Sequence, residues 1–396
     1  MGDNLSATWL RRLAATAVAA VLAMTVGLIP AQAGDFAAVS AAGTPDSPFW
    51  GLDAGWGAAS GGSGVTSVAS TSSTDAFAVG PICDLPCTPR NLAVRRWTGK
   101  TWTPIAAPAG LTGPASSLAT AVVAASSAHN AWVFAQLDQS ASSRTDALRW
   151  NGKRWAVTTF PVFSQIRTAA AFSTKNAWAF GTVGPSAKPF NVRFNGRKWQ
   201  QAKLPGDPQA LSAPSGSDVW AIGPTTKTAT KPQGKQALVA MHWTGSSWRK
   251  VAMPTVSKPA IDYVVPGSIV ALSPNNVWES YGLGNAGTCC VFGGIEHWNG
   301  TTWHSVSIPL PVVRMTSMAQ DGHGGLWMTV QTGGTAAQAF YHLSNGHWTQ
   351  LLPPSFVNLT IVPGQLSWVP GTRLLWAGAI GLEADGTEAV ILRYKP

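Results

Sequence analysis

Short runs of alternating small, apolar and β-branched residues follow one another along this chain, with turn residues between them. Residues 66–70, 237–243 and 389–394 are examples. Alternation with a period of two predicts half-buried strands, and no stretch beyond residue 33 keeps the 3.6-residue period of an amphipathic helix. The pattern therefore predicts an all-β protein.

A first motif recurs among these strands. It places an acidic or amide residue before a small or apolar residue and an aromatic, as in Asp75-Ala76-Phe77, and small residues and often a glycine follow. The seven aromatic positions of this motif are Phe77, Trp132, Trp178, Trp220, Trp278, Trp327 and Trp376. The steps between them run from 42 to 58 residues. A period of about 50 residues is typical of repeat architectures such as propellers.

A second motif follows the first in six of the units. Its aromatic or apolar ends stand five residues apart around a glycine, as Trp97 and Trp102 do around Gly99. The same spacing returns at positions 150 and 155, 194 and 199, 243 and 248, 298 and 303, and 343 and 348. Constant spacing around a glycine predicts a tight hairpin turn between two strands.

Each unit therefore contains four antiparallel strands, and seven such units predict a seven-bladed β-propeller. Unit seven ends at Pro396 without a fourth strand, while residues 49–56 precede unit one without an assignment. We expect this N-terminal segment to supply the outer strand of the last blade, which closes the ring and removes an exposed edge.

The N-terminus has the features of a secretory signal. Arg11 and Arg12 precede an apolar stretch that ends in the small-residue cleavage pattern Ala31-Gln32-Ala33. The sequence thus predicts a signal peptide over residues 1–33, a flexible leader over 34–45 and one propeller domain over 46–396. This organisation is typical of a secreted bacterial protein with no membrane insertion after cleavage.

Composition fits this interpretation and limits the partners. Charged residues make up 11% of the chain and hydrophobic residues 45%, which excludes a charge-rich disordered chain. The net charge is +10, or +9 without residues 1–33, with no basic run. The charge favours an anionic extracellular partner such as a wall polymer or acidic glycan, or it serves only solubility; no nucleic acid is expected.

The chain contains 20 tryptophans but only 4 tyrosines. Sixteen of the tryptophans stand at motif positions, where we expect them to fill the wedges between blades. Trp50, Trp56 and Trp368 lie outside the motifs, so they are expected to be freer for another role.

A basic residue precedes the third-strand aromatic in every unit: Arg96, Arg149, Arg193, His242, His297, His342 and Arg393. One interpretation is a ring of basic side chains that binds an anion, or a set of histidines that binds a metal. We favour a structural role with hydrogen bonds to neighbouring blades, because one histidine per blade is too scattered for a single metal site. No cofactor or metal is expected.

Four cysteines in an exported chain favour disulfides. Cys83 and Cys87 could close a short loop, whereas Cys289 and Cys290 are adjacent and could bond to each other or elsewhere. Three connectivities remain open.

The Asn/Thr-Gly-x-x-Trp turn resembles the Asp-box of sialidase-like propellers, which joins the third and fourth strands of a blade, although the aspartate is missing here. The units also resemble the Trp-rich blades of secreted bacterial propellers of the kelch or galactose-oxidase-like kind. These resemblances imply the fold; the activity has to be argued from a site.

The most irregular unit is the fifth, and it supplies the candidate site residues. Glu279 stands where the first motif normally has alanine, and Tyr281 and Glu296 lie in the same unit. Lys227, Lys231 and Lys235 form a mildly basic loop in unit four. The connections between second and third strands vary in length and include residues 83–87, 227–235 and 282–294, and variable loops on a rigid scaffold commonly bind ligands.

The sequence therefore predicts a monomeric, secreted, non-catalytic propeller that binds a glycan, a cell-wall polymer or a protein at one end of its blades. No nucleophile elbow and no phosphate-binding glycine loop occurs in it. The alternative is an extracellular carbohydrate-active enzyme of the sialidase or lyase kind. That enzyme would require carboxylates and arginines to converge at the mouth of the central channel.

Overall fold

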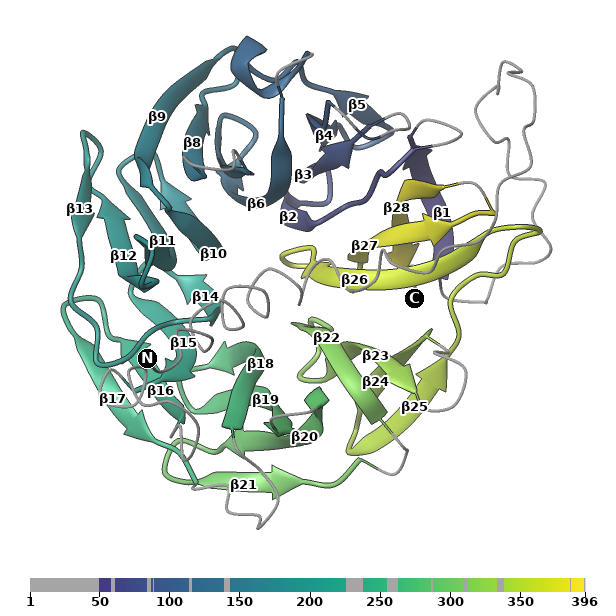
Figure 1. Ribbon diagram of the computed structural model, residues 1–396. Coiled ribbons are helices and arrows are strands. Elements are labelled where there is room, and N and C mark those ends of the chain that lie inside the picture. The colour runs from purple at the N-terminus through teal and green to yellow at the C-terminus, as the bar shows by residue number, and fades with distance from the viewer. Residues whose placement is uncertain are drawn as a thin grey trace, which may run out of the picture. The chain divides into compact units, whose positions relative to one another are not determined.

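The computed structural model describes residues 50–57, 61–83, 87, 89–113, 116–138, 143–225, 238–254, 263–285, 288–308, 312–332, 338–384, 386–394 and 396. Within this part of the chain there are 28 strands in seven antiparallel sheets of four, and one short helix, η1 (Ala109–Leu111). Figure 1 shows the sheets following one another around a ring. The predicted seven-bladed β-propeller is confirmed.

Blades 1 to 4 take their strands in chain order. Blade 1 consists of β2 (Ser67–Ser72), β3 (Asp75–Ile82), β4 (Asn91–Trp97) and β5 (Trp102–Pro104). Blade 2 consists of β6 (Leu118–Ser127), β7 (Asn130–Leu137), β8 (Arg144–Trp150) and β9 (Trp155–Val162). Blade 3 consists of β10 (Gln165–Ser173), β11 (Asn176–Val183), β12 (Lys188–Phe194) and β13 (Trp199–Gln201). Blade 4 consists of β14 (Ala210–Ser215), β15 (Asp218–Pro224), β16 (Leu238–Trp243) and β17 (Trp248–Ala252).

Blades 5 and 6 follow the same order, and blade 7 combines the two ends of the domain. Blade 5 consists of β18 (Tyr263–Ser273), β19 (Asn276–Asn285), β20 (Thr288–Trp298) and β21 (Trp303–Val306). Blade 6 consists of β22 (Val312–Gln320), β23 (Leu326–Thr332), β24 (Gln338–Ser344) and β25 (His347–Leu351). Blade 7 consists of β26 (Thr360–Trp368), β27 (Leu375–Leu382), β28 (Thr387–Tyr394) and, as its outer strand, β1 (Trp50–Trp56).

The second motif forms the turn between the third and fourth strands, as predicted. In blade 2 the Asn151 side chain accepts hydrogen bonds from the backbone N–H groups of Lys153 and Arg154 at 3.0 and 2.9 Å, and Gly152 takes a φ of +93°. Asparagine and glycine are favoured here because the first closes the turn and the second tolerates positive φ. Blade 6 differs: Ser344 pairs with His347, which leaves a two-residue turn.

The glycine that ends three copies of the first motif has a packing role. A Cβ atom at Gly80, Gly181 or Gly223 would lie 1.8, 1.7 or 1.8 Å from a backbone carbonyl oxygen of the segment that enters the blade. Only glycine permits this close approach. In blade 5 the equivalent position in β19 holds Tyr281 instead.

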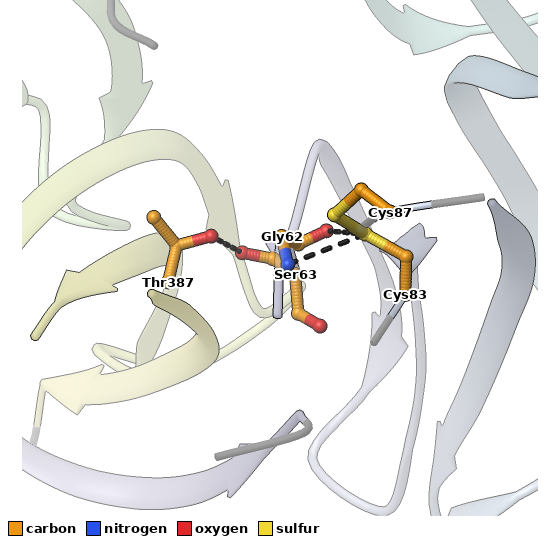
Figure 2. Close-up of a disulfide and its surroundings, with 5 residues drawn as sticks. All are labelled: Gly62, Ser63, Cys83, Cys87 and Thr387. Carbon is orange, nitrogen blue, oxygen red and sulfur yellow. Dashed lines mark hydrogen bonds between the residues drawn. A yellow bond between two sulfur atoms is a disulfide. The ribbon is translucent and has the colours of Figure 1, made fainter. Parts of the chain in front are cut away.

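Two neighbouring features close the ring. Strand β1 pairs antiparallel with β28 from Trp50, opposite Tyr394, to Trp56, opposite Ala389. The following segment, residues 61–66, then joins blade 7 to blade 1 (Figure 2). Thr387 donates to the Ser63 carbonyl at 2.9 Å, while the Gly62 N–H lies 3.2 Å from the Cys83 sulfur and donates to it.

The predicted Cys83–Cys87 disulfide is present beside this segment. Its two sulfur atoms would lie 2.6 and 3.0 Å from a Cβ atom at residue 62, so the bridge packs against the backbone of Gly62 (Figure 2). The disulfide therefore lies next to the segment that closes the ring. The side chains of Cys289 and Cys290 lie outside the described residues.

The tryptophans at motif positions are largely buried between blades, as predicted. Trp132 packs on Phe194 and Trp199 of the next blade with ring centroids 4.9 Å apart in both pairs. Trp178 packs on Trp243 of blade 4 in the same way, at 5.3 Å. These aromatic wedges form much of the core that holds neighbouring blades together.

The expectation for two of the tryptophans outside the motifs is wrong. Trp50 is fully buried and stacks on Phe340 at 4.0 Å, and Trp56 is 6% exposed beneath the guanidinium of Arg95. Both lie on β1, which has to bury its side chains to close the ring. Trp368 alone of the three is partly exposed, and it borders the axial cavity described below.

The repeated basic residue has a structural role, but its partners differ from the prediction. Most copies hydrogen-bond or ion-pair within their own blade: Arg96 reaches Asp75 at 2.7 Å and His242 reaches Asp218 at 2.7 Å. Each of these side chains also lies against the second-strand aromatic, as His342 stacks on Trp327 at 4.2 Å. Arg149 also donates to the Thr174 carbonyl of the next blade, and Arg193 and Arg393 contact next-blade rings, at Trp243 and Trp97.

In blades 6 and 7 the basic residue also pairs with an acid, but this acid does not come from the first motif. In blade 6 the motif position is Gly325, and Asp321 from the preceding turn binds His342 at 3.0 Å instead. A Cβ at Gly325 would lie 2.4 Å from the Asp321 carboxylate, so the carboxylate occupies the space of the missing side chain. In blade 7, Asp53 of β1 binds Arg393 at 2.5 Å.

Candidate functional site

The first strands of all seven blades surround an axial cavity of about 420 Å³. Among the described residues that line it there is no acidic, basic or histidine side chain. The lining is mostly alanine, valine and other apolar residues, and its polar side chains are Ser70, Ser212, Ser268, Ser317, Gln320, Gln365 and Ser367. The convergence of carboxylates and arginines that an enzyme at this channel requires is not found in the described lining.

Most of these polar side chains already bind the neighbouring blade. The Ser212 hydroxyl accepts from the Ala271 N–H at 2.9 Å, and Ser268 accepts from Met318 at 3.1 Å. Ser317, Ser367 and Gln365 make equivalent bonds at the blade 6–7 and 7–1 contacts. Serine therefore recurs in the first strands because it satisfies a backbone donor of the next blade at a crowded axis.

Glu279 and Glu296 lie directly opposite each other on β19 and β20. Glu279 is fully buried and Glu296 is 3% exposed. Elsewhere the position of Glu279 holds a buried apolar residue: Ala78, Val133, Ala179, Ala221, Met328 and Ala377. Blade 5 thus places two carboxyl groups side by side, one of them at a second-strand position that is apolar in the other blades.

The hydrogen bonding of this pair is one-sided. The Ser305 hydroxyl donates to Oε1 of Glu296 at 2.8 Å. Neither oxygen of Glu279, nor Oε2 of Glu296, has a hydrogen-bond partner among the described residues. Burial, together with repulsion from Glu296, raises the pKa of Glu279 well above its ordinary value of 4.5. Glu279 therefore retains its proton to a higher pH than an exposed carboxyl group.

Tyr281 belongs to the same cluster. Its hydroxyl lies 2.7 Å from the place of a Cβ at Gly294, so the ring covers the two glycines at 293 and 294. Burial and the two glutamates raise the pKa of Tyr281 above 10.0. Three of the predicted site residues are thus gathered on one face of blade 5, but Glu279, Tyr281 and Glu296 do not line the axial cavity.

The other predicted site residues, Lys227, Lys231 and Lys235, lie in residues 226–237, outside the described part of the chain. The connection that carries them is the longest of its kind: the links between second and third strands run from two residues in blade 5 to thirteen in blade 4. The turns between third and fourth strands have four residues in blades 1 to 5 and two in blade 6. The predicted difference in variability between the two connections is confirmed.

A second cavity, which sequence reasoning missed, lies between blades 5 and 6. It has a volume of about 300 Å³. Its lining residues are Trp278, Val306, Ser307, Gly324, Gly325, Leu343, Asn345, Gly346 and Trp348. The sequence feature that could have indicated this cavity is Leu343. It stands where five other units have tryptophan or phenylalanine at the start of the second motif.

Within the described residues, no group of three or more histidine, cysteine, aspartate or glutamate side chains could hold a metal ion. The same residues include no helix long and apolar enough to cross a membrane.

No family model matches the sequence, and no curated protein matches it either. Solved propellers do match the structure. A structure described as YCF48 bound to D1 peptide aligns over 88% of this chain and 97% of that chain, with 14% identity and a TM-score of 0.52. The β-propeller domain of the Trilobed protease from Pyrococcus furiosus, described as having an open velcro topology, aligns over 85% and 94%, with 9% identity and a TM-score of 0.52.

A GH74 xyloglucanase from Xanthomonas campestris aligns over 87% of this chain but only 53% of its own, with 16% identity and a TM-score of 0.53. The chain thus spans about half the length of that enzyme. Identities this low support the propeller fold alone, and the activities of these proteins are not transferred. In contrast to an open topology, blade 7 here is completed by β1.

Proposed function

We propose that this chain is an exported, non-catalytic binding propeller that recognises an extracellular glycan, cell-wall polymer or protein through the connections between second and third strands. The uncharged axial cavity carries this proposal, because its described lining has no acid, base or metal-ligating side chain and its serines are already hydrogen-bonded between blades. General acid–base catalysis requires such groups within reach of a substrate.

The alternative is a carbohydrate-active enzyme of the sialidase or lyase kind. Its support is the carboxyl pair of Glu279 and Glu296, because buried acids with raised pKa values occur at active sites. Both side chains are nevertheless buried and absent from the axial cavity, so a sugar bond in that cavity is out of their reach.

The binding proposal is tested by retention on immobilised cell-wall polymer across a salt series, with two matched triple variants. The first changes Lys227, Lys231 and Lys235 to glutamine. The second changes the three exposed lysines of turns at the other end of the blades, Lys100, Lys153 and Lys198, and so removes the same charge. We expect retention to weaken with salt and the first variant to bind about fivefold or more weakly, since rim charges act through long-range attraction.

The control variant should bind like the unchanged protein. Equal loss in both variants would show that net charge rather than the variable connections determines retention. Absent or salt-insensitive retention would contradict electrostatic recognition of the polymer.

A further inference from the structure

The contact between blades 5 and 6 departs from the packing found at most other blade contacts. Six of the seven second-strand aromatics are at most 2% exposed. The seventh, Trp278, is only partly buried. At five contacts the aromatic packs on a ring of the next blade, with centroids from 4.5 Å for Trp327 and Tyr394 to 6.5 Å for Trp220 and Trp303.

The cause lies in blade 6. Where most blades have an aromatic near the end of the third strand, β24 has Leu343, which is smaller and offers Trp278 no ring. The described ring contact of Trp278 is with His297 of its own blade, at 4.1 Å. The fourth-strand Trp348 has no described ring contact. The space that an aromatic fills elsewhere is therefore the cavity of about 300 Å³ that both tryptophans line.

The remaining lining supplies hydrogen-bonding groups without charge. Asn345 and Gly346 form the two-residue turn of blade 6, and a Cβ at Gly346 or Gly324 would meet nothing within 4 Å. Backbone groups and the Asn345 amide are therefore open to a ligand, and the Ser307 hydroxyl adds a further donor and acceptor. Among the described lining residues none is acidic, basic or histidine.

We infer that this crevice, here named the blade 5–6 crevice after its lining residues, is a binding site for a neutral sugar residue. Flat indole faces complement the C–H faces of a sugar ring, and amide, hydroxyl and backbone groups complement its hydroxyls. The volume is at the small end of ligand pockets, which fits a single residue of a longer chain. The absence of charge in the lining disfavours sialic acids and other anionic sugars.

The site is distinct from the one in the proposed function. The crevice is lined by turns between first and second and between third and fourth strands, at residues 324–325 and 345–346. The proposed function concerns the opposite ends of these strands. Either idea can therefore fail without the other.

The deciding experiment uses an array of neutral oligosaccharides of glucose, galactose, mannose and N-acetylglucosamine, together with sialylated and sulfated counterparts. Titration calorimetry then follows the best neutral probe. We expect a dissociation constant of about 0.1–1 mM, because one stacked ring offers few contact atoms. Substitution Leu343→Trp fills the crevice with the residue found at this position in blades 1, 2, 4 and 5, and should abolish binding while the protein stays folded.

Trp348→Ala removes a stacking face and should weaken binding at least tenfold. Its matched control is Trp248→Ala, a fourth-strand tryptophan that packs on Trp178 at 5.5 Å and lines no described crevice with it. The control should bind as the unchanged protein does, and near-ultraviolet circular dichroism verifies the fold of each variant. The triple lysine variant of the variable connection should also bind normally.

Three results would overturn the inference. They are no neutral sugar bound at 10 mM, unchanged affinity in the folded Leu343→Trp variant, or binding of anionic glycans or hydrophobic peptides in place of neutral sugars.

Discussion

At the scale of single residues, the differences between the seven copies carry the chemistry. Glu279 replaces a buried apolar residue, and Leu343 replaces an aromatic one. Asp321, by contrast, restores what its copy lacks: it accepts from the N–H groups of His323 and Gly325 at 2.7 and 2.8 Å and binds His342. A changed motif residue therefore leaves an unusual site where no neighbour replaces the lost contact, and it leaves the packing unchanged where a neighbour such as Asp321 supplies that contact.

The first prediction concerns Glu279 and pH. Because its pKa is raised in the folded protein, the folded state holds this proton more tightly than the unfolded chain. The stabilisation is complete below about pH 4.5 and is lost as pH rises towards the folded pKa. Glu279→Gln, which keeps a neutral side chain, should thus gain stability relative to the unchanged protein as pH rises.

Urea unfolding at pH 4, 6 and 8 measures this difference. A Glu279→Gln variant that is less stable than the unchanged protein at pH 8 would mean that the charged carboxylate has a stabilising partner.

At the scale of elements, β1 and the segment after it determine whether the ring closes. Trp50 begins β1, pairs with Tyr394 and packs in a cluster with Trp327 and Phe340 of blade 6. The segment over residues 61–66 then adds hydrogen bonds to both blade 7 and blade 1, as at Ser63 and Thr66. The closure therefore depends on side-chain burial as well as on strand pairing.

Trp50→Ala should destabilise the protein by about 3–5 kcal/mol, since it empties a fully buried aromatic site. Trp368→Ala, at a partly exposed tryptophan, should cost about 1–2 kcal/mol. Chemical unfolding compares the two. Equal losses would show that β1 contributes little to ring closure. Concentration-dependent association of Trp50→Ala alone would be expected if β1 detaches and exposes the edge of β28.

At the scale of the whole propeller, the repeat could be predicted from the sequence because each motif residue meets the same demand in every blade. The turn glycines, the buried tryptophans and the closing strand all follow from that periodicity. The expectation that Trp50 and Trp56 are free for another role is wrong because β1 carries no motif. Its burial depends on pairing with β28, more than 300 residues away in the sequence.

The candidate sites were less predictable. Unit five is recognisably irregular in sequence. The pairing of Glu279 with Glu296, however, depends on strand register, and the burial of both depends on packing in three dimensions. The blade 5–6 crevice depends on space between two blades. Leu343 indicates a smaller side chain at this contact between blades. A sequence does not show, however, whether neighbouring residues fill the space that a larger side chain would occupy.

The central claim is that this propeller binds and does not cleave. The direct measurement is mass spectrometry of the purified protein incubated with the glycan panel, which records complexes and products together. We expect complexes with intact glycan and no shortened products after prolonged incubation. Shortened products that appear with multiple turnovers, and that Glu279→Gln or Glu296→Gln abolishes, would contradict it and establish the carboxyl pair as catalytic.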